Sequence, residues 1–166
     1  MSETTTNDPG SPGQSAFERI IVLPRSGASE LDLDERYAVV SINDPGDPCP
    51  VKTRWGLLDC LTLHFHDFDT AQVEQDEWSA RNAMQPEHAM QIWEFVRRYA
   101  GGCPILVVHC FAGVSRSISV AMALADGLKL GRNVIGWANR PEWIADAAHG
   151  SPPNRHVYET MMRTVA

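Results

Sequence analysis

No apolar run in this sequence approaches the roughly 20 residues that a helix needs to cross a membrane. Signal-peptide character is also missing, because Met1–Thr6 has neither a basic nor an apolar region. Positive charge is scarce, since 14 Lys and Arg residues face 21 Asp and Glu residues, which gives a net charge of −7. These absences predict a cytoplasmic protein whose partners include neither nucleic acid nor an anionic membrane.

Cysteine motifs for metal binding are absent as well. The four cysteines, Cys49, Cys60, Cys103 and Cys110, form no C-x-x-C pair and show no zinc-type spacing. In a reducing compartment we expect all four to be free thiols. A regulatory disulfide between Cys110 and another cysteine is an alternative that the sequence leaves open.

The length of 166 residues suits a single domain. Residues 1–16 are rich in Ser, Thr, Pro and Gly and show no apolar periodicity, so we expect a disordered leader there. Residues 17–166 then form the folded domain, which is long enough to bury a core of its own.

Apolar runs and turn residues divide this domain into strands and helices. Strands are predicted over 17–23, 37–42, 60–65 and 105–108, and helices over 31–36, 86–100, 116–128, 134–138 and 154–165. The polar, acidic stretch 67–85 is predicted to be a long loop, and Asn154 to cap the last helix. We therefore predict an α/β fold with a central, mostly parallel sheet of about four or five strands flanked by helices.

The stretch Pro104–Ser119 carries the strongest chemical signal. Ile105–Val108 is a short apolar run typical of a strand buried on both faces, and apolar residues recur at helical spacing from 118 to 128. Cys110 therefore leaves a strand and Arg116 enters a helix. Ligands of open α/β sheets bind at the carboxyl ends of strands, where the connecting loop lies.

The loop between Cys110 and Arg116 suits the binding of an anion. Its backbone N–H groups can turn inward, and the helix that follows adds unpaired N–H groups and a partial positive charge. Gly113 frees the bend from a Cβ clash, and the Arg116 guanidinium can hold two phosphoryl oxygens. The same positive field favours the Cys110 thiolate, and the Ser117 hydroxyl can donate to its sulfur. The loop residues are Phe111, Ala112, Gly113, Val114 and Ser115.

The nine residues His109–Ser117, in the form H-C-x-A-G-x-S-R-S, resemble the signature of the protein tyrosine and dual-specificity phosphatase superfamily. The resemblance implies a phosphatase-like domain over residues 17–166, similar to small bacterial members of the superfamily. It also implies that Cys110 is the nucleophile, that the 111–115 backbone and Arg116 bind phosphate, and that Ser117 assists the thiolate. His109 is expected to support the loop through ring hydrogen bonds to the backbone.

Phosphate-ester cleavage needs a general acid for the leaving oxygen, which in this superfamily is an Asp upstream of the nucleophile. The candidates are Asp67, Asp69, Asp76 and Glu77. Asp67 follows the strand 60–65 in the sequence Phe-x-Asp, so its carboxylate is expected at the same sheet edge as Cys110. We select Asp67, with Asp69 second, because Asp76 lies in a helical and polar context typical of a solvated face.

A metal site is a competing interpretation of the same segment. His64, His66 and Asp67 lie close together in sequence, and two histidines on one strand face can bind a metal. No second ligand cluster follows later in the chain. We therefore expect no metal and no other cofactor.

Together these features predict a phosphomonoester hydrolase that forms a phosphocysteine intermediate. The short chain is similar to dual-specificity enzymes, and Phe111, Ala112 and Val114 lack the basic residues that phosphoinositide-specific members tend to carry. A phosphorylated protein is therefore the expected substrate and partner, on phosphotyrosine alone or with dual specificity. The alternatives are a catalytically weak phosphopeptide-binding module, a phosphatase of a small-molecule phosphate and a metal-dependent hydrolase.

Overall fold

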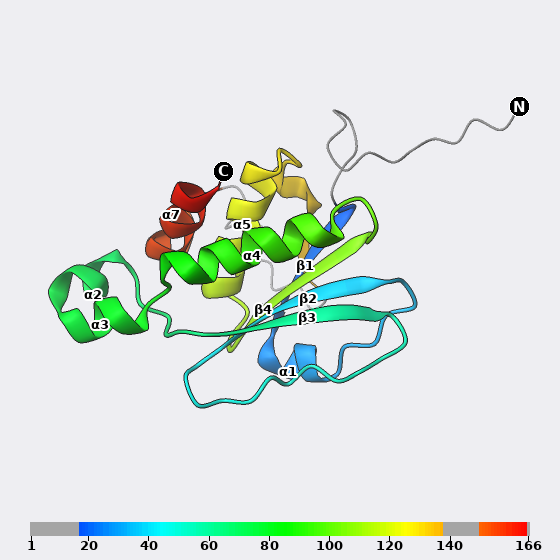
Figure 1. The fold of residues 1–166 in the computed structure, drawn as a ribbon, viewed down its shortest axis with the longest axis horizontal. Helices are drawn as coiled ribbons and strands as arrows, with labels where there is room; N and C mark the ends of the chain where they lie inside the picture. Colours follow the sequence, from blue (N-terminus) through cyan, green and yellow to red (C-terminus); the bar gives the residue numbers. More distant parts are fainter. Residues whose placement is uncertain (1–16, 138–149, 166) are drawn as a thin grey trace, which may run out of the picture.

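A sheet of five parallel strands runs through the protein in a computed structural model that describes residues 17–137 and 150–165. The strand order is β3-β2-β4-β1-β5 (Figure 1). The strands are β1 (Arg19–Pro24), β2 (Tyr37–Asn43), β3 (Leu57–His64), β4 (Ile105–Cys110) and β5 (Ile135–Trp137). The predicted α/β class and parallel sheet are confirmed, whereas the predicted leader 1–16 lies outside the described residues.

Helices cover both faces of the sheet unequally. The long helices α4 and α5, together with α7, lie on one face, and the short α1 lies on the other (Figure 1). None of the helices in these described ranges is long and apolar enough to cross a membrane. The helices are α1 (Arg25–Ser29), α2 (Thr70–Gln75), α3 (Glu77–Asn82), α4 (Pro86–Tyr99), α5 (Arg116–Gly127) and α7 (Arg155–Thr164), with a 3-10 turn η1 (Arg132–Val134).

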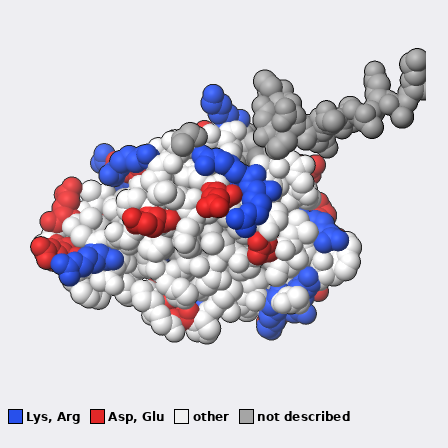
Figure 2. Space-filling view, viewed as in Figure 1, with Lys and Arg blue, Asp and Glu red and all other residues white. Residues whose placement is uncertain are grey.

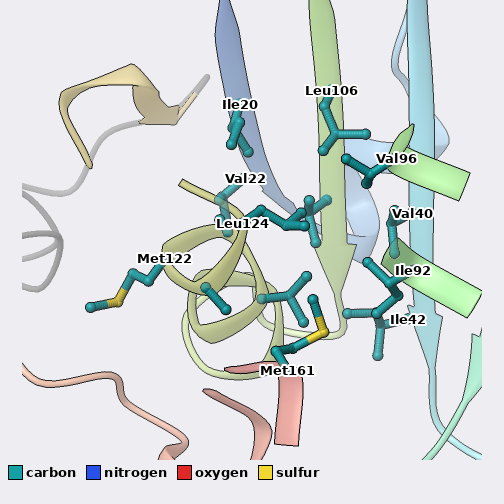
Figure 3. Close-up of a cluster of buried hydrophobic side chains, with 14 of the residues drawn as sticks. Ile20, Val22, Val40, Ile42, Ile92, Val96, Leu106, Met122, Leu124 and Met161 are labelled. Carbon is teal, nitrogen blue, oxygen red and sulfur yellow. The ribbon is translucent and has the colours of Figure 1, made fainter. Parts of the chain in front are cut away.

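Side-chain alternation along the strands divides the core into two layers. On β4, Leu106, Val108 and Cys110 belong to the large cluster under α4 and α5, while Ile105 and Val107 belong to a smaller cluster on the opposite face. Figure 3 shows the larger cluster, in which side chains from β1, β2, β4, α4, α5 and α7 meet. Helix α5 is buried from Arg116 through Ala125, so it forms the centre of this layer.

The same alternation places the polar residues near the strand ends on opposite faces of the sheet. Cys110 shares the face of α5, whereas His109 lies on the other face, opposite Ser41 in the register of β2 and β4. Asn43 follows Ser41 on the same face of β2. The thiol and the imidazole of neighbouring residues are thereby separated by the sheet itself.

Two predicted helices are wrong. Residues 31–36 form no helix, because Leu31 and Leu33, two positions apart, both pack against the smaller cluster as an extended segment. The helix in this region is α1, which begins directly after Pro24. The helix predicted over 134–138 is instead the end of η1 followed by β5, because Ile135–Trp137 pairs with the free edge of β1. Position 138 lies outside the described residues.

The predicted loop 67–85 is also wrong, because it contains α2 and α3. Asp69 caps α2, forming a capping box with Gln72, and Asp76 caps α3 by accepting from the Ser79 N–H. Acidic and small polar residues that suggested a loop therefore act as helix caps. The predicted helices at Pro86 and after Asn154 are confirmed, and Asn154 caps α7 through the Val157 N–H.

Charges of both signs are interspersed on the face shown in Figure 2, with no large basic patch on that face. Several of them pair one helical turn apart, such as Glu94 with Arg98 on α4. Exposed pairs of this kind contribute little stability. They mark a solvated helix face.

Candidate active site

The carboxyl ends of β1, β2, β3 and β4 meet at one edge of the sheet. Cys110 is the last residue of β4 and Arg116 the first of α5, so the 111–115 loop spans the edge between them. The loop is fixed to β1, because Cys110 pairs with Pro24 and the Arg25 N–H donates to the Phe111 carbonyl at 3.0 Å. The parallel register thus determines where the loop begins.

Gly113 allows the loop to turn against β1. Its φ is +72°, in the left-handed region that L side chains rarely adopt. A Cβ on Gly113 would lie 2.5 Å from the Pro24 nitrogen, which is backbone and cannot swing aside. Both the conformation and the close approach therefore require glycine here.

The Cys110 sulfur lies inside this turn. Its residue is only 2% exposed, and the sulfur lies 3.3 Å from the Gly113 nitrogen, whose N–H donates to it, and 3.1 Å from the Ser117 Oγ. Ser117 is fully buried in the first turn of α5. The Gly113 N–H and the Ser117 hydroxyl, at the N-terminus of α5, therefore both lie within hydrogen-bond distance of the sulfur.

Arg116 is a buried cation beside the same loop. It is 3% exposed, and its Nη1 donates to the Phe65 carbonyl at 2.7 Å and pairs with Asp44 Oδ1 at 2.8 Å. Its Nε is buried and has no hydrogen-bond partner among the described residues. Buried donors are normally satisfied, so this N–H is suited to an acceptor on a bound anion.

His109 holds the base of the loop as a neutral imidazole. Its Nδ1 lies 3.3 Å from the Cys110 carbonyl, which can only accept, so Nδ1 carries the proton and Nε2 accepts from the Ser41 hydroxyl at 2.5 Å. Burial, helped by the positive charges of Arg25 and Arg116, lowers the pKa of His109 to about 4. The ring is therefore a fixed support with both nitrogens engaged.

Asp67 reaches the 111–115 loop from the segment after β3. Its Oδ1 accepts from the Ser115 hydroxyl and from the Asn154 amide, each at 2.8 Å. The turn that directs it is tight, because the Phe68 N–H donates to the His66 carbonyl across Asp67. Asp67 is exposed overall, so its carboxylate is accessible from solvent.

The other three acidic candidates have different surroundings. Asp69 accepts hydrogen bonds from the Thr70 and His156 N–H groups. Burial alone would raise the pKa of its carboxyl, but these bonds outweigh burial and lower it. Asp76 is the cap of α3, and Glu77 pairs with Arg81 on its exposed face. Of the four, Asp67 is the one that bonds to the 111–115 loop.

His64 and His66 do not act together in this structure. His64 Nε2 lies 2.9 Å from the Asp47 carbonyl, whereas the His66 ring stacks on Phe68 and lies beside Trp78. Within residues 17–137 and 150–165, no group of three His, Cys, Asp or Glu side chains has the geometry to hold a metal ion.

The variable side chains of the loop face different surroundings. Phe111 is 61% exposed and lines a pocket of about 510 Å³ with residues of α1 and the loop after β2, namely Arg25, Ser26, Ser29 and Pro50. Val114 packs against the large core cluster. The loop therefore has an anchored half and an open half beside a pocket.

Sequence reasoning missed Asp44 as the partner of Arg116 and gave Asn154 only the role of a helix cap. Asn154 is buried and joins three elements, because it caps α7, donates to Asp67 and donates to the Phe68 carbonyl at 3.2 Å. Asp44 lies in a stretch rich in turn residues. Its position directly after a parallel strand was the available signal, since strand ends collect at one sheet edge.

Gly113→Ala tests the close approach of the loop to β1. We expect it to lower the free energy of unfolding by about 2–4 kcal/mol, because the Cβ combines an unfavourable φ with a backbone clash. Urea unfolding provides the measurement. Gly46→Ala is the matched control, since Gly46 has a φ of +91° and open space around its Cβ position; it should cost about 1 kcal/mol. Equal losses in both variants would contradict the clash.

The neutral state of His109 predicts a pH dependence of stability. The pKa of about 4 in the folded state lies below the ordinary 6.5, so the unfolded state binds the proton more readily between these values. Stability is therefore full above pH 6.5 and falls as pH drops toward 4, by on the order of 3 kcal/mol. His109→Gln should flatten that part of the curve in pH-dependent urea unfolding, and His64→Gln, at an exposed histidine, should not. Parallel curves for wild type and His109→Gln would show that His109 does not contribute.

At this edge of the sheet lie a buried thiol that accepts the Gly113 N–H, a buried guanidinium whose Nε has no partner among the described residues, and a carboxylate bonded to the loop between them. In chemical terms, such groups can serve as a nucleophile, an anion clamp and a proton donor. No family model matches the chain, and no curated protein matches it.

Proposed function

We propose that this protein is a phosphomonoester hydrolase that works through a phosphocysteine intermediate. One observation carries the proposal. The buried Cys110 sulfur accepts a hydrogen bond from the Gly113 N–H. It also lies within hydrogen-bond distance of the Ser117 hydroxyl, in the first turn of the 12-residue helix α5. A thiol at a helix N-terminus that accepts a backbone N–H is suited to act as a nucleophile.

In the first step, the Cys110 thiolate attacks phosphorus in line with the leaving oxygen. A P–S bond forms and the P–O bond to the leaving group breaks. The backbone N–H groups of residues 111–115 and the Arg116 side chain hold the equatorial oxygens. The unpartnered Arg116 Nε supports this role, because a phosphoryl oxygen would satisfy a buried donor.

Asp67 protonates the departing oxygen in that step. Its support is the bond from Ser115, which ties the carboxylate to the loop that would hold the phosphoryl group. The Asn154 amide donates to the same oxygen, Oδ1, and fixes the side chain from α7. The second oxygen, Oδ2, is the one that we assign to proton transfer.

In the second step, water attacks phosphorus and the P–S bond breaks. Asp67, now ionised, takes the proton of that water, and Ser117 donates to the departing thiolate at the 3.1 Å separation. The cycle returns Cys110 as thiolate and Asp67 as acid. It requires no metal and no organic cofactor.

A phosphorylated protein is the proposed substrate, on phosphotyrosine or with dual specificity, and the cytoplasm the proposed location. None of Phe111, Ala112 and Val114 is basic, which does not favour a multiply phosphorylated headgroup. The pocket beside the exposed Phe111 gives room for residues that flank a phosphorylated side chain. The net charge of −7 disfavours nucleic acid as a partner.

Cys110→Ser tests the mechanism. We expect turnover of an aryl phosphate to fall at least 10³-fold, because serine does not ionise in this site, while binding of vanadate or phosphate persists. Steady-state hydrolysis and isothermal titration provide the two readouts. Cys103→Ser is the matched control, since Cys103 is equally buried but donates only to backbone carbonyls. Retained turnover in Cys110→Ser would reject the phosphocysteine route, and loss of turnover on chelation would favour a metal-dependent hydrolase.

The assignment of Asp67 is tested by leaving-group dependence. Asp67→Asn should lower kcat about 10²–10³-fold for an alkyl or phenyl phosphate and much less for a p-nitrophenyl or more acidic leaving group. Asp69→Asn keeps a good N-cap residue at the start of α2, so it should change stability little and leave this dependence unchanged. If Asp69→Asn changes the dependence instead, Asp69 is the acid. Tight phosphopeptide binding with no turnover in the wild type would support a binding module.

A further inference from the structure

Two cysteines outside the proposed mechanism lie close to each other. The sulfur of Cys49, in the segment between β2 and β3, lies 3.8 Å from the sulfur of Cys60 on β3. Both residues are partly exposed, and both are free thiols. The sequence does not predict this proximity, because Cys49 follows the turn-rich stretch 43–48 and precedes a segment with no regular pattern.

The sheet register and the 44–56 segment bring these thiols together. Cys60 pairs with Val39, and the next residue on the same face of β2 is Ser41, whose hydroxyl accepts from the Cys49 thiol at 3.3 Å. The segment is held directly before Cys49. Arg25 donates to the Pro48 carbonyl at 2.6 Å, and His64 contacts the Asp47 carbonyl.

We propose that Cys49 and Cys60 form a redox-active dithiol, which a hydroperoxide converts to an intramolecular disulfide without participation of Cys110. The two sulfurs must approach by about 1.8 Å to reach the bond length of a disulfide. Cys49 lies outside regular secondary structure, so side-chain rotation together with a small shift of this segment can provide that approach. The proposal does not depend on the proposed phosphatase activity.

The chemistry balances with one equivalent of peroxide. The Cys49 sulfur attacks one peroxide oxygen, so that an S–O bond forms, the O–O bond breaks and an alcohol or water leaves. The Cys60 sulfur then attacks Cys49, so that an S–S bond forms, the S–O bond breaks and water leaves. The two thiols lose two electrons and two protons in total, and the peroxide takes them up.

The surroundings of the two sulfurs differ in a way that suits these separate roles. Burial favours the neutral thiol of Cys49, but the hydrogen bonds that it shares with Ser41, Thr62 and the Val51 backbone lower its pKa. Burial, together with the neighbouring charge of Cys49, raises the pKa of Cys60 to about 12. Cys49 is therefore the first nucleophile, and Cys60 resolves its sulfenic acid.

The disulfide would change the part of the fold that contacts Arg116. It would fasten the 44–56 segment to β3, and this segment begins with Asp44, the ion-pair partner of Arg116. The disulfide would also remove the hydrogen bond that the Cys49 thiol donates to the Ser41 hydroxyl. That hydroxyl in turn donates to His109. The oxidised protein should accordingly resist unfolding more strongly than the reduced one.

The experiment uses the full chain with Cys110→Ser, so that oxidation of the proposed nucleophile does not interfere. The reduced protein is treated with one equivalent of hydrogen peroxide, alkylated, digested with trypsin and analysed by mass spectrometry. Trypsin separates Cys49, in peptide 37–52, from Cys60, in peptide 55–81. We expect these two peptides linked, with the loss of two hydrogen atoms, restored by a reductant.

Matched variants define which thiols react. Cys49→Ser and Cys60→Ser, each added to Cys110→Ser, should abolish the linked peptide, whereas Cys103→Ser should retain it. Peroxide should raise the Tm of Cys110→Ser by several degrees and leave that of the variant lacking Cys49 and Cys60 unchanged. Free Cys49 and Cys60 after treatment, sulfinic acid on either without linkage, or linkage to Cys103 would each overturn the proposal.

Discussion

The parallel pairing of β4 with β1 on one side and β2 on the other is the constraint on which the candidate site depends. It aligns Cys110 with Pro24 and His109 with Ser41. Because successive side chains on a strand point to opposite faces, the thiol enters the layer of α5 and the imidazole enters the layer below. A slip of one residue in β4 would exchange the two and leave the sulfur away from its donors.

Local positive charge is built into a chain that is acidic overall. Arg116 is buried, and a buried charge is costly without partners, so Asp44 and the Phe65 carbonyl compensate it. These partners both use Nη1, and the buried Nε has no partner among the described residues. The cation is thus stabilised in the folded protein, while one of its donors is left unsatisfied.

Four separate parts of the chain hold the groups around the loop. Ser41 on β2 supports His109 on β4, Asp67 approaches from the segment after β3, and Asn154 joins Asp67 to α7. Each contact is between polar groups that are hydrogen-bonded in the folded state, which favours a fixed geometry over adaptable packing. The arrangement therefore combines elements that are far apart in sequence, from β2 to the last helix.

The sequence by itself determined the α/β class and the β4–loop–α5 unit that contains Cys110, Gly113 and Arg116. Those features depend on local apolar patterns and on backbone chemistry, both of which are written in consecutive residues. The tertiary structure alone decided the partner of Arg116, the bond between Ser115 and Asp67 and the neutral state of His109. It also decided the close approach of Gly113 to β1 and the meeting of Cys49 with Cys60. The helices α2 and α3 within 67–85 and the strand Ile135–Trp137 were mispredicted for the same reason. Asp, Ser and short β-branched segments fit several local structures, and the choice among them depends on which distant residues pack against them.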